Sequence, residues 1–116
     1  MKYFSEHILN GRGYACFCLT EPQSGSDASN VKTTAVKDGD EWVINGEKCF
    51  ITNGGEADIA CVFAATDPTK GAKGISAFMV PTNTPGFSVT KYEDKCGFRT
   101  ISTCSLKFDN VRVPAA

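Results

Sequence analysis

The feature that most constrains the fold of this chain is a series of short apolar runs, separated by turn residues at roughly even spacing. No stretch with the period of an amphipathic helix separates these runs. Strands without intervening helices disfavour a doubly wound parallel sheet, whose crossovers need such helices. The pattern predicts an all-β domain, an antiparallel β-barrel or orthogonal sandwich of seven to eight strands. The predicted strands span residues 14–20, 31–36, the run around Trp42 and Ile44, and residues 47–52, 58–66, 74–81, 87–92 and 102–113.

Two turn signals lie close together in this series. The segment Lys37-Asp38-Gly39-Asp40 is rich in turn-forming residues. Asn45-Gly46 is the strongest two-residue hairpin signal in the sequence, because both residue types accept the positive φ angles of a type I′ turn. It predicts a hairpin between the strand around Trp42 and the strand at residues 47–52.

The first residues differ from the rest of the chain. Phe4 and Ile8 are at helical spacing, and Asn10-Gly11 is typical of a helix end. Residues 1–12 are therefore expected to form a short helix stump, the remnant of a preceding helical domain, and residues 13–116 to form the β-domain. The chain ends just after a predicted strand, so we expect it to be the middle piece of a longer protein.

Composition narrows the classes of partner. The chain has 12 Lys and Arg against 13 Asp and Glu, which gives a formal net charge of −1. A near-neutral chain gains little from phosphate electrostatics, so nucleic acid is not an expected partner. No apolar run reaches the ~20 residues that span a bilayer, and no signal peptide is recognisable near Met1. We expect a soluble, cytoplasmic protein, with the mitochondrial matrix as the alternative.

The six cysteines do not indicate a disulfide framework or a metal site. No C-x-x-C spacing occurs, and the single histidine is remote from them in sequence. In a reducing compartment, cysteines within apolar strands are small buried hydrophobes or free thiols. The residues concerned are Cys16, Cys18, Cys49, Cys61, Cys96 and Cys104.

Two segments have a composition that suits ligand binding. In the first, an apolar strand runs through a rigid Glu21-Pro22 step into a small-residue loop, where Gly25 permits close approach of a ligand. The backbone N–H groups and hydroxyls of such a loop suit a phosphate. In the second segment, Phe50 and Thr52 share one face of a strand and suit a flat heteroaromatic ring. Taken alone, each segment is better explained as an ordinary β-loop, or as a core phenylalanine beside a strand-end threonine.

Together the two segments form a more specific pattern. Thr-Glu-Pro-x-x-Gly-Ser-Asp at 20–27, followed by Asn-Gly-x-Lys-x-Phe-Ile-Thr-Asn-Gly at 45–54, resembles the paired signatures of the acyl-CoA dehydrogenase family. The later segments 74–80, 96–103 and 108–114 also resemble the middle β-domain of that family. The resemblance implies that FAD lies between this β-domain and a C-terminal helical bundle, and that the remaining domains complete a homotetrameric enzyme.

The resemblance also implies roles for residues of the first segment. Phe17, Cys18, Leu19 and Thr20 would line the flavin. Leu19 and Thr20 would meet its pyrimidine edge, where Thr20 offers a hydroxyl. The backbone of Ser26 would reach the cofactor pyrophosphate, and its side chain would reach the CoA part of the substrate.

In the second segment, Phe50, Ile51 and Thr52 would lie at the other side of the flavin. Phe50 occupies a position that is often Trp in the family. Thr52 would hydrogen-bond near flavin N5, where hydride arrives. Gly25, in the loop of the first segment, would let the backbone approach the cofactor.

The reaction implied is the α,β-dehydrogenation of an acyl-CoA thioester. A glutamate removes the α proton while the β hydrogen passes to flavin N5 as hydride, and the electrons then leave to an electron-transfer flavoprotein. That glutamate belongs to the C-terminal bundle, so no catalytic residue is expected in this chain, and the chain alone is expected to be inactive. Glu21 is instead expected to support its own loop, which Asp27 would cap. The glutamates that do not match the catalytic position are Glu21, Glu41, Glu47, Glu56 and Glu93.

Other functions stay open. Acyl-CoA oxidases, nitroalkane oxidases and flavin monooxygenases share this domain and differ in their electron acceptor. A further alternative is a non-catalytic β-barrel that binds single-stranded nucleic acid or serves only in assembly. The near-neutral charge disfavours a nucleic-acid partner.

Overall fold

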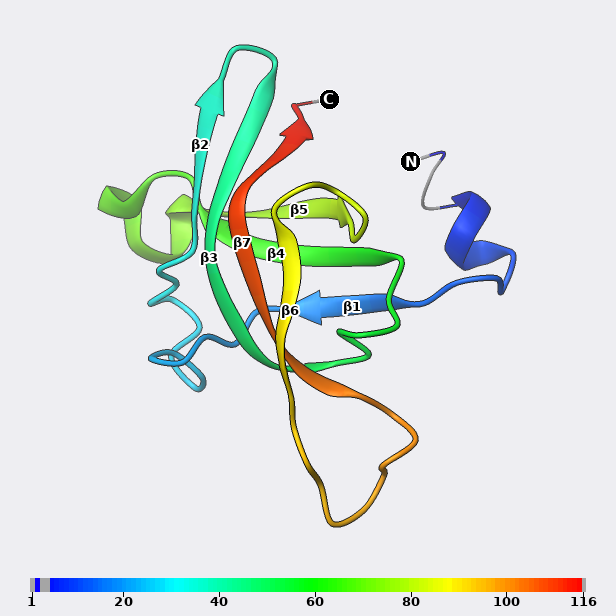
Figure 1. The fold of residues 1–116 in the computed structure, drawn as a ribbon. Coiled ribbons are helices and arrows are strands. Elements are labelled where there is room, and N and C mark those ends of the chain that lie inside the picture. The colour runs from blue at the N-terminus through cyan, green and yellow to red at the C-terminus, as the bar shows by residue number, and fades with distance from the viewer. Residues whose placement is uncertain (1, 3–4, 116) are drawn as a thin grey trace.

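The computed structural model describes residue 2 and residues 5–115 of the chain. Within these residues, seven strands form one sheet in the order β1-β4-β2-β3-β7-β6, and β5 pairs with β4 outside this order (Figure 1). The elements in chain order are η1 (Ser5–Leu9), β1 (Ala15–Cys18), β2 (Thr34–Asp38), β3 (Glu41–Thr52), β4 (Ile59–Ala65), η2 (Pro68–Gly74), β5 (Ile75–Pro81), β6 (Phe87–Tyr92) and β7 (Thr103–Pro114).

The sheet has two halves that cross. Strands β2, β3, β7 and β6 pair antiparallel, and β4 pairs antiparallel with β5 but parallel with β1. One parallel pair, Thr34 with Ala65, links β2 to β4. Figure 1 shows β1, β4 and β5 running across the direction of the other strands, so that the sheet curls into a half-barrel. The predicted all-β fold is confirmed and most pairs are antiparallel as expected. The sheet is nevertheless mixed, because long connections bring β4 alongside β1 and β2 in the same direction.

The core lies between the two halves, where inward positions alternate with outward ones. Cys18, Val62 and Leu106 come from three different strands and have no exposed surface. Burial of a valine or leucine side chain contributes about 1.5–3 kcal/mol each to stability. The rings of Trp42 on β3 and Phe78 on β5 meet at a centroid distance of 5.6 Å, which joins the two halves at one end.

The cysteines follow the sequence-based expectation. All six are free, and Cys16, Cys18, Cys49 and Cys104 are buried. The Sγ atoms of Cys16 and Cys18 lie 3.5 Å apart on the inward face of β1. The thiols therefore serve mainly as small apolar side chains of the core.

The predicted hairpin at Asn45-Gly46 is wrong. Both residues lie inside β3, which continues from Glu41 to Thr52, and the hairpin instead closes at the Gly39-Asp40 turn, between the paired Asp38 and Glu41. Gly46 has a φ angle of 152° and sits at a register shift opposite β7. A Cβ atom at this position would lie 2.3 Å from Oγ1 of Thr33. The glycine is therefore needed for close approach of two chain segments within a bulge rather than for a turn.

The predicted N-terminal helix stump corresponds to one short helical segment, η1, with π-helical geometry. Gly11 ends it with a φ angle of 65°, and its N–H donates to the carbonyl of Ile8 at 3.0 Å, as expected for a helix stop. Phe4, which contributed to the helical spacing, lies outside the described residues. Among the helical segments that the structure describes, none has the length and apolar character needed to cross a bilayer.

Candidate functional site

The two signature segments, distant in sequence, lie side by side in the structure. The backbone N–H of Cys49 donates to the carbonyl of Thr20 at 2.9 Å, just beyond the end of β1. This bond brings the end of the first segment against the second half of β3. Residues 17–20 and 50–52, the two groups predicted to line a flavin, therefore belong to one region of the surface.

Side chains of this region point alternately outward and inward. Phe17 and Phe50 are 60% and 65% exposed, and Thr52 is also exposed. Cys18 and Ile51 are buried in the core. Of the residues predicted to line a flavin, these two can therefore present only backbone atoms to a ligand on the outer surface.

The second half of β3 departs from regular alternation. A register shift relative to β7 lies between Lys48 and Ile51, and Phe50 has a φ angle of 56°. Two consecutive residues, Lys48 and Cys49, are consequently both buried. A bulge of this kind redirects a side chain, and here it accompanies the outward position of the Phe50 ring.

Phe17 has apolar neighbours on the adjacent strands. Its ring lies 4.8 Å from that of Phe63 on β4, with 55° between the ring planes. Strand register also places Phe17 beside Cys61, and Cys61 beside Met79 on β5. The outer face of β1, β4 and β5 thus has a continuous apolar row that ends in an exposed aromatic ring.

Polar groups accompany this apolar surface. Among the described residues, no protein group hydrogen-bonds to the hydroxyl of Thr20 or of Thr52. Thr20 is half-buried and Thr52 is exposed. Both hydroxyls are therefore available to a ligand that lies against the region.

The loop after Glu21 has its own internal support. The N–H of Ser29 donates to the carboxylate of Asp27 at 3.2 Å, and the hydroxyl of Ser24 donates to the Asp27 carbonyl. Asp27 thus caps the loop, as predicted. Gly25 and Ser26 are exposed at its tip, and a Cβ atom at Gly25 would meet nothing within 4 Å. Space is therefore open at the position where close approach of a ligand was predicted.

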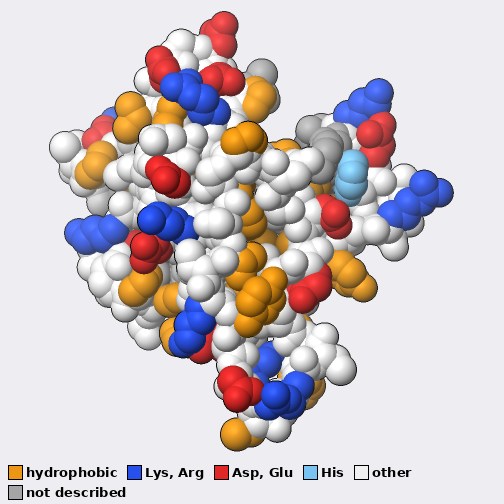
Figure 2. All heavy atoms as spheres, in the orientation of Figure 1, with side chains coloured by type: hydrophobic (Ala, Val, Ile, Leu, Met, Phe, Trp, Pro, Cys, Tyr) orange, Lys and Arg blue, Asp and Glu red, His pale blue; other side chains and the backbone are white. Residues whose placement is uncertain are grey.

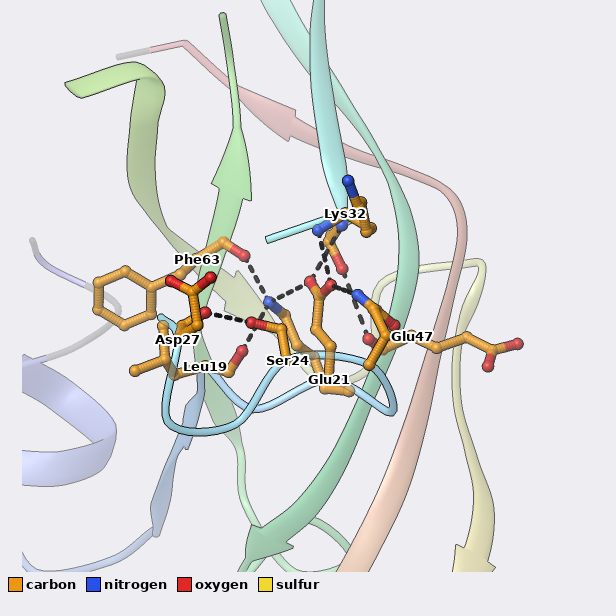
Figure 3. Close-up of polar contacts among 10 residues, drawn as sticks. Leu19, Glu21, Ser24, Asp27, Lys32, Glu47 and Phe63 are labelled. Atoms are coloured by element: carbon orange, nitrogen blue, oxygen red, sulfur yellow. Dashed lines mark hydrogen bonds and ion pairs between the residues drawn. The ribbon is translucent and has the colours of Figure 1, made fainter. Parts of the chain in front are cut away.

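A buried ion pair lies beneath the region. The side chain of Lys48 has no exposed surface, and its ammonium donates three hydrogen bonds to residues that are labelled in Figure 3. The acceptors are the Glu21 carboxylate at 2.8 Å, the Phe63 carbonyl at 2.7 Å and the Leu19 carbonyl at 3.1 Å. An ammonium has three protons, so the hydrogen-bonding capacity of Lys48 is filled by protein groups from three segments.

The partner carboxylate is equally well satisfied. Glu21 accepts the backbone N–H groups of Lys32 at 2.6 Å and Thr33 at 3.0 Å, besides the Lys48 ammonium. Burial by itself would raise the pKa of Glu21, but hydrogen bonds from Lys48, Thr33 and Lys32 together lower it to about 2. The predicted structural role of Glu21 is confirmed, since the carboxylate ties its loop to β3 and to the segment before β2.

Sequence reasoning missed the role of Lys48. The lysine stands within the second signature, but no role was predicted for it. Alternation gave no signal, because it places Lys48 on the same face as Phe50 and Thr52, and only the bulge between Lys48 and Ile51 turns its side chain inward. An inward lysine requires a buried partner, and Glu21 is a carboxylate in the other signature.

Known proteins resemble this chain over its whole length. The family model described as acyl-CoA dehydrogenase, middle domain, matches residues 16–111. An acyl-CoA dehydrogenase of Bacillus subtilis (strain 168) is 51% identical over 116 residues, which is 100% of this chain and 30% of that protein.

Solved structures agree in fold. The butyryl-CoA dehydrogenase from Megasphaera elsdenii superposes with a TM-score of 0.94 at 48% identity, over 98% of this chain and 30% of that one. A glutaryl-CoA dehydrogenase from Mycobacterium smegmatis, solved in complex with FADH2, gives a TM-score of 0.87 at 42% identity, over 98% of this chain and 28% of that one. The chain thus spans less than a third of the length of these proteins.

Proposed function

The chain belongs to the acyl-CoA dehydrogenase family, as a middle domain, and on this premise we propose that it forms one wall of the FAD site in a longer enzyme. That enzyme would dehydrogenate an acyl-CoA thioester between its α and β carbons. One observation carries the proposal: the Cys49 N–H···O=C Thr20 bond joins the two signature segments beneath the exposed Phe17 and Phe50 rings. An exposed aromatic surface beside free hydroxyls suits a flat, polar-edged ring.

The chemical character of these residues fits a flavin. The isoalloxazine ring is flat and largely apolar, and it has hydrogen-bonding atoms along its pyrimidine edge and at N5. Phe17 and Phe50 supply apolar contact, while Thr20 and Thr52 supply hydroxyls that no described protein group occupies. Cys18 would contribute through its backbone alone, because its side chain is buried.

We assign the residues to the two sides of the ring as follows. Leu19 and Thr20 meet the pyrimidine edge from the end of β1. Phe50 packs against the ring from β3, and the Thr52 hydroxyl donates a hydrogen bond near N5. The inward side chain of Ile51 supports the bulge from within the core.

The loop tip would hold the charged parts of the ligands. Gly25 leaves open space for a close approach, and Ser26 is exposed beside it. Backbone N–H groups at this tip bind the cofactor pyrophosphate in our proposal, because such groups attract anions without a basic side chain. The Ser26 hydroxyl would contact the CoA part of the substrate.

The chemistry needs one group from outside this chain. A bound flavin would supply the acceptor for the hydride that leaves the β carbon. Proton removal from the α carbon needs a base, and Glu21 cannot provide it, because its side chain is buried on Lys48 and its pKa is about 2. The remaining domains of the enzyme would supply that base, and the chain by itself would be inactive.

The assembly and the partners of the enzyme belong to the same proposal. We assign it to the cytoplasm, as a homotetramer that passes electrons to an electron-transfer flavoprotein. An oxidase of the same superfamily would transfer them to oxygen instead. The rate at which air re-oxidises the reduced enzyme distinguishes the two, since a dehydrogenase reacts slowly with oxygen.

The test is a flavin titration of the intact enzyme beside this chain alone. The intact enzyme should bind FAD and lose its visible absorbance when butyryl-CoA is added without air. The chain alone should bind FAD much more weakly, because half of the surroundings of the flavin are missing. The proposal fails if the intact enzyme binds no flavin, or binds it without bleaching by any acyl-CoA of a series from short to long chain.

A further inference from the structure

We infer that Lys48 is a positioning residue of the cofactor site, which sets the affinity for FAD and the reduction potential of bound FAD through the carbonyl of Leu19. This inference rests on the proposed function, because it concerns the same site. It adds a role for a buried residue that touches neither cofactor nor substrate.

The Lys48 ammonium lies where several chain segments meet. Lys48 is on β3, and its acceptors belong to the end of β1, to the loop after it and to β4. The three distances of 2.7–3.1 Å lie within the normal range of N–H···O hydrogen bonds. The lysine thus joins three segments at the point where the strand of the first signature ends.

The hydrogen bond to Lys48 also fixes the direction of the peptide that follows Leu19. The Leu19 carbonyl points inward to Lys48, and a trans peptide is planar with its N–H opposite its C=O. The N–H of Thr20 therefore points away from the ammonium, and no described protein group accepts it. The next carbonyl, that of Thr20, is also held inward, by the N–H of Cys49 at 2.9 Å. Because the carbonyls of Leu19 and Thr20 are both held inward, the N–H of Thr20 is fixed in an outward direction.

The charge of the ammonium acts on the same peptide. A cation at a carbonyl oxygen polarises the peptide, which makes its N–H a stronger donor. Reduction of a flavin places negative charge on the pyrimidine edge, which is the edge that we assign to Leu19 and Thr20. A stronger donor there favours the reduced form, so loss of the ammonium should lower the reduction potential of bound FAD.

A purely structural explanation is weaker. Replacement of a buried ion pair by apolar groups of similar volume is often neutral or stabilising, so stability alone does not require a charged pair here. The inward site could be filled by a methionine of nearly the same length. An apolar side chain, however, cannot donate hydrogen bonds to the carbonyls of Leu19 and Phe63.

The experiment compares variants of the intact enzyme. Glu21→Gln with Lys48→Met removes both charges together, so neither is left unpaired in the core. Glu21→Gln alone keeps the ammonium on the Leu19 carbonyl. Arg112→Met is the matched control, because it removes an ion pair with Asp38 and Glu41 that is exposed at the other end of β3 and β7.

The measurements are FAD affinity, the reduction potential of bound FAD and the thermal unfolding of the apoenzyme. The double variant should bind FAD at least about tenfold more weakly. Its bound flavin should favour the reduced form about tenfold less, which is about 30 mV for a two-electron couple. Glu21→Gln should lose clearly less affinity and less potential than the double variant, because it keeps the ammonium beside the Leu19 carbonyl, and Arg112→Met should match wild type.

The outcomes separate this inference from the proposed function. Wild-type enzyme that binds no FAD overturns both. If the wild-type enzyme binds FAD and the folded double variant has unchanged FAD affinity and reduction potential, only the role of Lys48 is overturned. A Glu21→Gln variant that loses as much as the double variant also overturns it, because the ammonium would then be dispensable. If the double variant does not fold, Glu21→Gln with Lys48→Gln, which keeps a shorter amide donor, is measured against the same criteria.

Discussion

At the scale of single residues, Glu21 is the group whose charge matters most to stability. Burial would raise the pKa of this carboxyl, but the hydrogen bonds from Lys48, Thr33 and Lys32 lower it from 4.5 to about 2. Between these two values the unfolded chain binds the proton more readily than the folded chain. The stabilisation is therefore fully present above the unfolded pKa and is lost as the pH falls through the folded pKa.

The first prediction concerns this pH window. Lowering the pH from about 6 to about 3 should reduce the free energy of unfolding by about 2 kcal/mol through Glu21, beyond the effect of other carboxylates. Urea unfolding at both pH values measures this loss. Glu21→Gln should be less stable than wild type at the higher pH and should lose correspondingly less on acidification. Equal losses in the two proteins would show that Glu21 is not the responsible group.

The second prediction concerns Thr52 in the intact enzyme. Thr52→Val keeps the shape of the side chain but removes a hydroxyl that we place near flavin N5. Loss of one hydrogen bond, about 1–1.5 kcal/mol, should slow bleaching by acyl-CoA about tenfold. Stopped-flow absorbance of bound FAD measures that rate. Thr90→Val is the control, because the Thr90 hydroxyl already donates to the Ser105 carbonyl at an exposed position on β6. An equal effect of both substitutions would contradict the role of Thr52.

Residues of the candidate site differ in how far the sequence alone could reveal them. Phe50 and Thr52 were predicted to share a face, and both are exposed. Asp27 was correctly predicted to cap its loop, because a short polar side chain in a loop bonds to nearby backbone groups. Glu21 was correctly predicted to support the same loop, although its backbone donors, Lys32 and Thr33, lie further along the chain. The role of Lys48 could not be predicted, because its three acceptors come from different segments and two of these acceptors are backbone carbonyls. Only the complete fold brings such acceptors together.

At the scale of elements, β3 shows where local preference yields to long-range pairing. Both Gly39-Asp40 and Asn45-Gly46 have the composition of a hairpin turn. Strand β7 is as long as β3 and pairs with it from Glu41 to Thr52, so the chain stays extended through Asn45-Gly46. The positions of the strands could be predicted from the alternation of apolar and polar residues. The choice between the two turns depended on pairing with β7, about sixty residues away, and such pairing is not encoded locally.

The third prediction tests the bulge at Gly46. Gly46→Ala should reduce the free energy of unfolding by about 2–4 kcal/mol, because its Cβ would clash with Thr33 and the backbone is in a region that favours glycine. Chemical denaturation of the chain measures this. Gly97→Ala, where a Cβ atom would meet nothing within 4 Å, is the control and should change stability by less than about 0.5 kcal/mol. A small effect at Gly46 would mean that β3 can rearrange without loss.

At the scale of the whole molecule, one half of the sheet has an uncovered apolar surface. Register places Phe17, Cys61 and Met79 in one row across β1, β4 and β5. Phe17 is 60% exposed and Met79 is 47% exposed, and Phe63 packs beside Phe17. In Figure 2, hydrophobic side chains gather near the middle of the face shown, with charged side chains spread around them. Contiguous apolar surface of this kind usually marks a contact with another protein surface.

The fourth prediction follows for the chain studied alone, without the other domains that we propose. Its apolar row should make the chain self-associate, so sedimentation equilibrium should give an average mass that rises with concentration. Met79→Ser should weaken this association, because it replaces an exposed apolar side chain of the row by a hydroxyl. Val36→Ser is the control, since Val36 is 63% exposed but lies on β2 in the other half of the sheet. A monomeric mass at every concentration would show that the row is too small to hold two copies together. Equal weakening by both substitutions would place the contact elsewhere.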